Sequence, residues 1–157
     1  MDLLSLGTAV VWVDFFTIVL SKIFRLGASL DKWYERYGMT AVLSDCLVIV
    51  LGILVAKYYF PKADLRHFIM IVIAIQVVHD FLFYSFVISP LPLGQNTMID
   101  LFKEYALENS YKIIVADSIM IASTVLIADR LMHVKKDFVV FAGLLGVYAL
   151  TYIIHTH

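Results

Sequence analysis

Residues 42–56 read VLSDCLVIVLGILVA, and residues 115–129 read VADSIMIASTVLIAD. Each stretch is apolar along most of its length and carries an aspartate near its beginning, Asp45 in the first and Asp117 in the second. A charged side chain at the centre of a membrane helix costs about 2.5–3.5 kcal/mol on insertion scales, so such residues tend to face a helix bundle, a partner or water. The two stretches therefore predict membrane-spanning helices that hold carboxylates inside a bundle.

The composition of the whole chain also predicts a membrane protein. Of its 157 residues, 62% are hydrophobic and 16% are charged, and the mean hydropathy is +0.89. Soluble domains average roughly 45–50% apolar and about 25% charged residues. A chain of this length cannot bury so much apolar surface in a water-soluble globule. The formal net charge of −1 indicates no nucleic-acid partner, and the single cysteine, Cys46, excludes an intrachain disulfide.

Five segments are long enough to cross a bilayer core of about 30 Å, which needs roughly 20 helical residues. We predict an all-α fold in which residues 1–157 form one transmembrane domain. The predicted spans lie near residues 5–26, 38–60, 67–89, 111–132 and 137–156. The lipid bilayer is therefore the first partner that the sequence predicts.

Two further segments predict short helices that lie in the membrane interface. Residues 96–109 alternate apolar and charged side chains, which is typical of such a helix. The stretch DKWYERY at 31–37 predicts a shorter one. Its Trp33, Tyr34 and Tyr37 fall at a span boundary, where amphipathic rings prefer the level of the lipid headgroups.

Five spans assign the connections and the two chain ends to two sides of the membrane, which we call side A and side B. Side A holds the N-terminus and the connections near 61–66 and 133–136, and side B holds the two interfacial helices and the C-terminus. The twelve Lys and Arg residues divide equally between the two sides. The positive-inside rule therefore assigns no orientation.

An internal repeat of a helix pair is also possible. One fixed offset superimposes Asp45 on Asp117 and Cys46 on Ser118, and an interfacial helix precedes each aspartate. Such a repeat would run parallel about an axis along the membrane normal, with the first span outside it. The alternative is that two apolar helices resemble each other by chance.

Counting about 1.5 Å of rise per residue places several polar residues at a common depth. Asp45, Asp117 and the adjacent His79 and Asp80 lie roughly 10 Å below side B, and Asp14 lies near the middle of the first span. We predict that these residues form a buried polar layer whose carboxyl groups face protein or water. Other polar side chains expected near this layer are Ser44, Gln76, Ser118, Thr17 and Lys112.

This layer has three interpretations. In the first, neutral Asp and His side chains hydrogen-bond between helices and fix their packing. In the second, the carboxylates and His79 form a path for protons or cations. In the third, Asp45, His79, Asp80 and Asp117 hold a divalent metal ion, although no spacing motif supports a metal site. No cofactor is indicated, and the lack of HExxH and GxSxG motifs favours a protein that is not an enzyme.

The stretch QVVHDFLFYSFV at 76–87, followed by NTMIDLFKEYALENSYKIIVADSIMIASTVLIAD at 96–129, resembles a group of viral proteins. These are uncharacterised multi-spanning membrane proteins of large double-stranded DNA viruses of algae and protists. The resemblance implies a structural or assembly component of a viral internal membrane, or of a host-cell membrane. Its expected partners are further copies of the chain or capsid and membrane proteins. The alternative function is a small proton or cation channel or transporter that uses the carboxylate layer.

Small residues in an apolar helix allow close approach of another helix. The fifth predicted span contains Gly143 and Gly146 on one face. We therefore expect this face to contact another helix rather than lipid.

Overall fold

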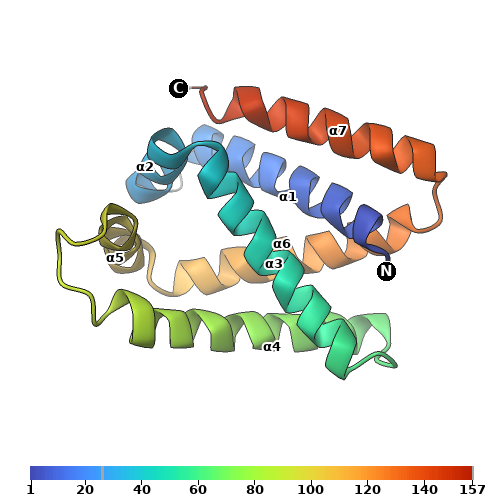
Figure 1. Cartoon of the computed structure of the whole chain (residues 1–157), viewed down its shortest axis with the longest axis horizontal. Coiled ribbons are helices and arrows are strands. Elements are labelled where there is room, and N and C mark those ends of the chain that lie inside the picture. Colours follow the sequence, from blue (N-terminus) through green and yellow to red (C-terminus); the bar gives the residue numbers. More distant parts are fainter. Residues whose placement is uncertain (26, 157) are drawn as a thin grey trace.

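The computed structural model describes residues 1–25 and 27–156. The last residue of the predicted span 5–26 and the last residue of the predicted domain 1–157 lie outside these described residues. The elements follow along the chain (Figure 1) as α1 (Leu3–Phe24), α2 (Ala28–Tyr37), α3 (Met39–Tyr59), α4 (Leu65–Phe83), η1 (Tyr84–Ile88), α5 (Thr97–Asn109), α6 (Tyr111–Leu131) and α7 (Lys136–Ile153).

Five of these helices are long and apolar enough to cross a membrane. They are α1, α3, α4 together with η1, α6 and α7, which correspond to the five predicted spans. The described residues contain helices and no strands, so the predicted all-α fold is confirmed. The third span differs from the prediction in its last turn, where the π-helix η1 replaces regular α-helix just before Ser89 and Pro90. Ser89 still has α-helical backbone angles, φ −63° and ψ −44°, and the helix ends at Pro90, whose nitrogen has no hydrogen to donate.

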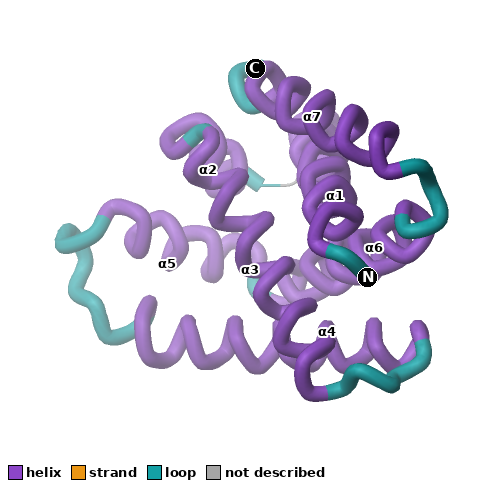
Figure 2. The backbone as a smooth tube through the Cα atoms, turned by 45° about the vertical axis from the view of Figure 1, so that its right-hand side comes forward, coloured by secondary structure: helices purple, strands orange, loops and turns teal. Residues whose placement is uncertain are grey.

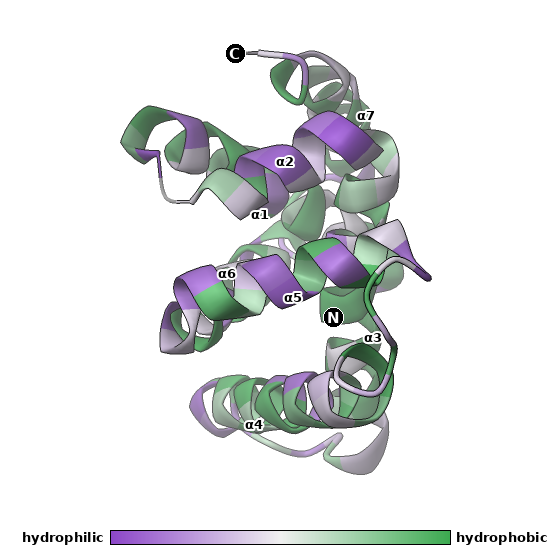
Figure 3. Cartoon of the chain, turned by 90° about the vertical axis from the view of Figure 1, so that its left-hand side faces the viewer, coloured by the Kyte–Doolittle hydropathy of each residue, from purple (hydrophilic) through white to green (hydrophobic). Residues whose placement is uncertain are grey.

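The two short helices, α2 and α5, lie side by side across one end of the bundle, which is side B (Figure 2). We call this pair the roof, and Figure 3 shows hydrophilic residues along both of its helices. Polar contacts join the two helices in antiparallel register. The ammonium group of Lys32 lies 2.9 Å from Oε2 of Glu104, and the Tyr37 hydroxyl donates to Oγ1 of Thr97 at 3.0 Å. Both predicted interfacial helices are thus present as helices.

Four of the spans form a closed ring beneath the roof. α1 packs against α6, α6 against α4, α4 against α3, and α3 against α1. α7 lies outside the ring and packs against α1 (Figure 1). The ring encloses aliphatic side chains that are almost fully buried, among them Ala9, Ile18, Ile53, Val72, Ile121 and Val125.

α3 and α6 share several features that the predicted internal repeat would give them. Each has 21 residues and follows a residue with the same unusual backbone conformation. Gly38 has φ 51° and ψ −127°, and Ser110 has φ 46° and ψ −125°. Gly38 and Ser110 are separated by 72 residues, the same separation that Lys32 and Glu104 have. This is also the offset that superimposes the two span aspartates, so the structure supports the predicted repeat.

The repeat shows that α1 occupies a position that symmetry would give to α7. An approximate two-fold axis along the bundle relates α2 and α3 to α5 and α6, and the equivalent residues Lys32 and Glu104 pair across it. Because α4 packs against both α3 and α6, its symmetry mate should do the same. α1 makes these two contacts, while α7 packs on the outside of α1. The first span therefore completes the ring although it lies outside the repeat.

α7 approaches α1 closely at its glycines. A Cβ atom on Gly143 would lie 2.7 Å from Oγ1 of Thr8, and Gly146 has equally little room. The close approach lets the Thr8 hydroxyl donate to the Val139 carbonyl at 3.1 Å, and Trp12 Nε1 donates to another α7 carbonyl at 3.0 Å. The predicted contact of this glycine face with another helix is confirmed.

Candidate functional site

Each helix of the ring contributes one aspartate to a common region below the roof. Asp14 comes from α1, Asp45 from α3, Asp80 from α4 and Asp117 from α6. The carboxylates of Asp14 and Asp45 interact electrostatically, and so does Asp117 with both Asp80 and Asp45. We call these four residues the acidic core. Asp45 and Asp117 occupy equivalent positions in α3 and α6, 72 residues apart in the sequence.

Asp45 is held by the roof. Its Oδ2 accepts hydrogen bonds from Trp33 Nε1 at 3.1 Å and from the Tyr34 hydroxyl at 2.9 Å. Both donors are buried. Burial, and then the charges of Asp45 and Asp14, raise the pKa of Tyr34, so its hydroxyl keeps its proton and remains a donor at physiological pH. Asp45 therefore anchors α2 to the bundle.

Asp14 is fully buried and has no partner. Its relative exposure is 0%, and neither of its carboxylate oxygens has a hydrogen-bond partner among the described residues. The Tyr34 hydroxyl lies beside Asp14 but donates to Asp45. Within residues 1–25 and 27–156, no Lys or Arg forms an ion pair with the acidic core. An ionised carboxylate is strongly disfavoured in a buried site without hydrogen bonds or an opposite charge. A bound proton or cation would remove this cost.

The carboxylate of Asp80 on α4 contacts an exposed side chain, that of His79. Oδ1 of Asp80 accepts a hydrogen bond from Gln76 Nε2 at 2.8 Å and lies 3.0 Å from Nδ1 of His79. Its other oxygen, Oδ2, is buried and has no partner among the described residues. The side chain of His79 is 47% exposed and that of Asp80 is 29% exposed. The pair therefore links an exposed imidazole to a buried carboxylate oxygen.

Asp117 has a different environment from its symmetry mate, Asp45. In the repeat, Tyr105 of α5 takes the position of Trp33, and Ala106 takes the position of Tyr34. Burial, and then the nearby charge of Asp117, raise the pKa of Tyr105, so this phenol also keeps its proton. Asp117 nevertheless forms no hydrogen bond with the described residues. One half of the core thus has two donors on its carboxylate, and the other half has none.

The remaining predicted polar residues do not connect the spans. Ser44, Ser118 and Thr17 each donate to the backbone carbonyl four residues earlier in their own helix. Lys112 is exposed and forms no ion pair with the acidic core. A hydroxyl on a helix readily reaches the carbonyl of its own preceding turn. For this reason the predicted hydrogen-bond network between spans does not form in the described part of the chain.

The geometry does not favour a metal site. Among the described residues, no three His, Cys, Asp or Glu side chains lie close enough together to hold a metal ion. Of the predicted ligands, Asp45 is occupied by the donors of the roof, and His79 and Asp80 contact each other without a third ligand group beside them among the described residues. Asp117 is left without a second ligand group around a common centre.

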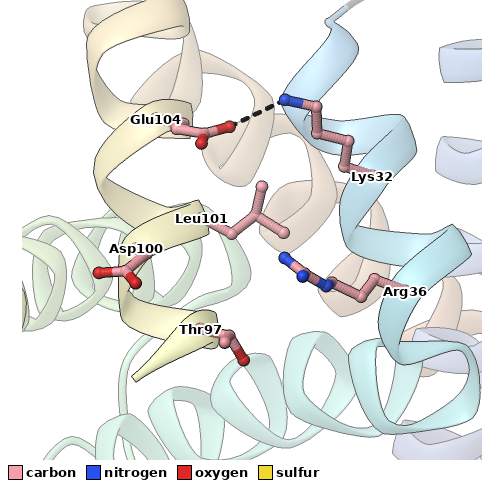
Figure 4. Close-up of a pocket in the computed structure, with 6 residues that line it drawn as sticks. All are labelled: Lys32, Arg36, Thr97, Asp100, Leu101 and Glu104. Atoms are coloured by element: carbon pink, nitrogen blue, oxygen red, sulfur yellow. Dashed lines mark hydrogen bonds and ion pairs between the residues drawn. The ribbon is translucent and has the colours of Figure 1, made fainter. Parts of the chain in front are cut away.

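A cavity of about 330 Å³ lies in the roof between α2 and α5 (Figure 4). The ion pair of Lys32 and Glu104 crosses it, and the Arg36 side chain extends into it (Figure 4). The floor is closed, because Leu101 is only 4% exposed and the rings of Trp33 and Phe102 pack with their centroids 4.8 Å apart. The cavity is lined by Lys32, Arg36, Thr97, Asp100, Leu101 and Glu104. It therefore ends above the acidic core and does not reach it.

Glu108 of α5 caps the N-terminus of α2. Its carboxylate accepts hydrogen bonds from the backbone N–H of Ser29 and of Ala28, each at 2.9 Å. The hydrogen bonds from Ser29, and then from Ala28, lower the pKa of Glu108. The cap satisfies two of the N–H groups that a helix N-terminus leaves without partners.

The capping contact predicts a pH dependence of the roof. Because the folded pKa of Glu108 is lowered, its contribution is present above the ordinary pKa of glutamate and is lost as the pH falls through the lowered value. We expect hydrogen exchange in α2, corrected for its intrinsic pH dependence, to accelerate on acidification. Glu108→Gln should remove this acid-dependent component, and an identical acid response in parent and variant would contradict the prediction.

No family model matches the chain. No curated protein and no solved structure matches it either. The resemblance to viral membrane proteins therefore stays a prediction, and the function has to be inferred from the geometry of the acidic core.

Proposed function

We propose that the protein is an integral membrane protein whose acidic core binds protons. The observation that carries this proposal is Asp14, which is fully buried beside Asp45 with both oxygens unpartnered. Like charges held close together in a low dielectric repel strongly, and no basic residue of the described chain pairs with them. We therefore expect that fewer than four of these carboxyl groups are ionised at the same time. Binding a proton neutralises the charge of a carboxylate.

A proton suits the geometry better than a metal ion does. A bound metal needs several ligands around one centre, and the described residues offer no such group. A proton needs a single carboxylate and a neighbour that accepts or returns it. The succession of electrostatically coupled carboxylates from Asp80 through Asp117 and Asp45 to Asp14 supplies such neighbours.

Infrared difference spectroscopy on the protein in lipid bilayers tests proton binding directly. When the pH is stepped, the parent should show carbonyl bands of protonated carboxyl groups that are absent or displaced in Asp14→Asn. Asparagine keeps the volume and the hydrogen-bonding groups but does not titrate. Asp137→Asn is the matched control, because Asp137 lies exposed in the first turn of α7. Identical band patterns in the parent and in Asp14→Asn would refute the proposal.

A structural role is the second candidate, and the contacts of Asp45 favour it. A carboxylate that binds Trp33 and Tyr34 fixes the roof to the ring whether or not protons move. In the viral setting that the resemblance implies, the protein would be a compact component of an internal membrane. Among the described residues, the parts outside the spans are the roof and short connections. Under this alternative, the Asn variants would fold normally and titration would leave the core unchanged.

A further inference from the structure

We propose that the acidic core is open to side B along one edge only, with His79 and Asp80 as the entrance, and that it is closed toward side A. This inference rests on the proposed function, since it names the route by which protons reach the acidic core. It concerns access, however, and can be tested without measuring proton binding.

The two halves of the repeat differ at one position in the roof, which is Tyr34 in the first half and Ala106 in the second. In the half that contains α3, Tyr34 is 3% exposed and covers both Asp45 and Asp14. In the half that contains α6, the equivalent residue is Ala106, whose methyl group fills far less space. The loss of one large ring at this position leaves the α4–α5–α6 edge less covered than its symmetry mate. This is the edge at which His79 and Asp80 are exposed.

A series of coupled groups leads inward from this edge. The exposed His79 contacts Oδ1 of Asp80, whose Oδ2 is buried. Asp80 interacts electrostatically with Asp117 of α6, and Tyr105 of α5 lies within range of the charges of both. Asp117 is in turn coupled to Asp45, which lies beside the fully buried Asp14. The series thus begins at an exposed side chain, His79, passes the half-buried Asp80, Asp117 and Asp45, and ends at the fully buried Asp14.

Water rather than lipid is the expected surrounding of the entrance. His79 stacks on Phe83, with ring centroids 5.8 Å apart, and Phe83 contacts Phe102 of α5, with centroids 6.2 Å apart. These contacts place His79 on the side of α4 that turns toward the roof. A polar pair at this depth is expensive in hydrocarbon, whereas water beneath the edge of α5 solvates it. The negative charge of the core admits protons and small hydrated cations and repels anions.

The half of the bundle toward side A contains no corresponding route. Among the described residues, Asp14 is the only fully buried charged side chain, and the buried polar side chains of this half, Ser5, Thr8 and Thr124, carry hydroxyls that do not titrate near neutral pH. A proton path requires titratable groups or water along its length, and most of the side chains buried here are aliphatic. The buried side chains of this half include Leu6, Val10, Ile53, Ala56, Val72, Val125 and Ala128.

Cysteine labelling in liposomes with a membrane-impermeant thiol reagent tests this access. In a Cys46→Ser background, Lys62→Cys reports side A and Thr156→Cys reports side B. We expect His79→Cys to react from the side that labels Thr156→Cys, and Val125→Cys to react from neither side. Adding Ala106→Tyr, which copies Tyr34 into the open half, should slow the labelling of His79→Cys several-fold without slowing that of Thr156→Cys.

Any of four results would overturn the inference: labelling of His79→Cys from side A, no labelling of His79→Cys from either side, no effect of Ala106→Tyr, or labelling of Val125→Cys from side A. The converse substitution provides a second measurement. Tyr34→Ala should make the native Cys46, which is 8% exposed and coupled to Asp14 and Asp45, reactive from side B. Labelling as expected together with unchanged infrared bands in Asp14→Asn refutes proton binding alone. Altered infrared bands with an unlabelled His79→Cys refute the entrance alone.

Discussion

Replacing Asp45 with Leu should release the roof from the ring and lower the stability of the protein. The substitution leaves the indole N–H of Trp33 and the hydroxyl of Tyr34 buried without an acceptor. An unsatisfied buried donor costs roughly 1–3 kcal/mol, and here there are two. Asp45→Asn keeps an acceptor oxygen and should remain close to the parent in stability. Thermal unfolding in detergent and hydrogen exchange in α2 measure the two effects.

Asp117→Leu is the matched control for this experiment. Asp117 is the symmetry mate of Asp45, yet it forms no hydrogen bond with the described residues. Leucine at this position leaves no buried donor unsatisfied, so we expect a much smaller loss of stability than for Asp45→Leu. From sequence alone the two positions are equivalent and leucine is expected to destabilise both. Equal destabilisation by the two leucine variants would show that the hydrogen bonds of the roof are not the cause.

Replacing Gly143 with Leu should separate α7 from α1. Even the first atom of the new side chain would lie 2.7 Å from Oγ1 of Thr8 and 3.9 Å from the Thr8 Cα, so the helices must move apart. Overpacking of this kind costs about 1–3 kcal/mol, and the separation also breaks the hydrogen bond from Thr8 to the Val139 carbonyl.

Gly7→Leu provides the control, because a Cβ at Gly7 of α1 meets no atom within 4 Å. Both variants add the same apolar side chain to a glycine in a spanning helix. Thermal unfolding in detergent should therefore distinguish a loss of packing from a change in composition. An unchanged melting temperature for Gly143→Leu would contradict the close α1–α7 contact.

The spans could be predicted from the sequence because they depend on distances along one helix. An apolar run of about 20 residues specifies a membrane helix whatever its neighbours are. The depth of Asp45 or Asp117 follows from the rise per residue once the helix end is known. The same counting places His79 and Asp80 in the predicted layer, whereas their position at its edge is seen only in the structure. These properties depend only on the position of a residue along the sequence.

The neighbours of each helix could not be predicted in this way. Spanning helices that are apolar on all faces give little indication of which face meets which partner. The position of α1 between α3 and α6 is therefore absent from the sequence pattern. Trp33 and Tyr34 were also misplaced: their position at a span boundary predicts contact with headgroups, whereas their rings turn inward to Asp45. The offset between the repeats does contain one signal, the replacement of Tyr34 by Ala106.

The place of α1 in the ring has a consequence for how the chain is made. Contacts of α1 reach the far end of the sequence, since Thr8 and Val139 are 131 residues apart. During synthesis α1 is produced before its neighbours α3, α6 and α7. Asp14 therefore enters the membrane before the helix that brings Asp45 beside it, at the stage when its carboxyl group is most costly in lipid. We therefore expect that α1 stays near the insertion site, or that the Asp14 carboxyl stays protonated, until the later spans are inserted and pack around α1.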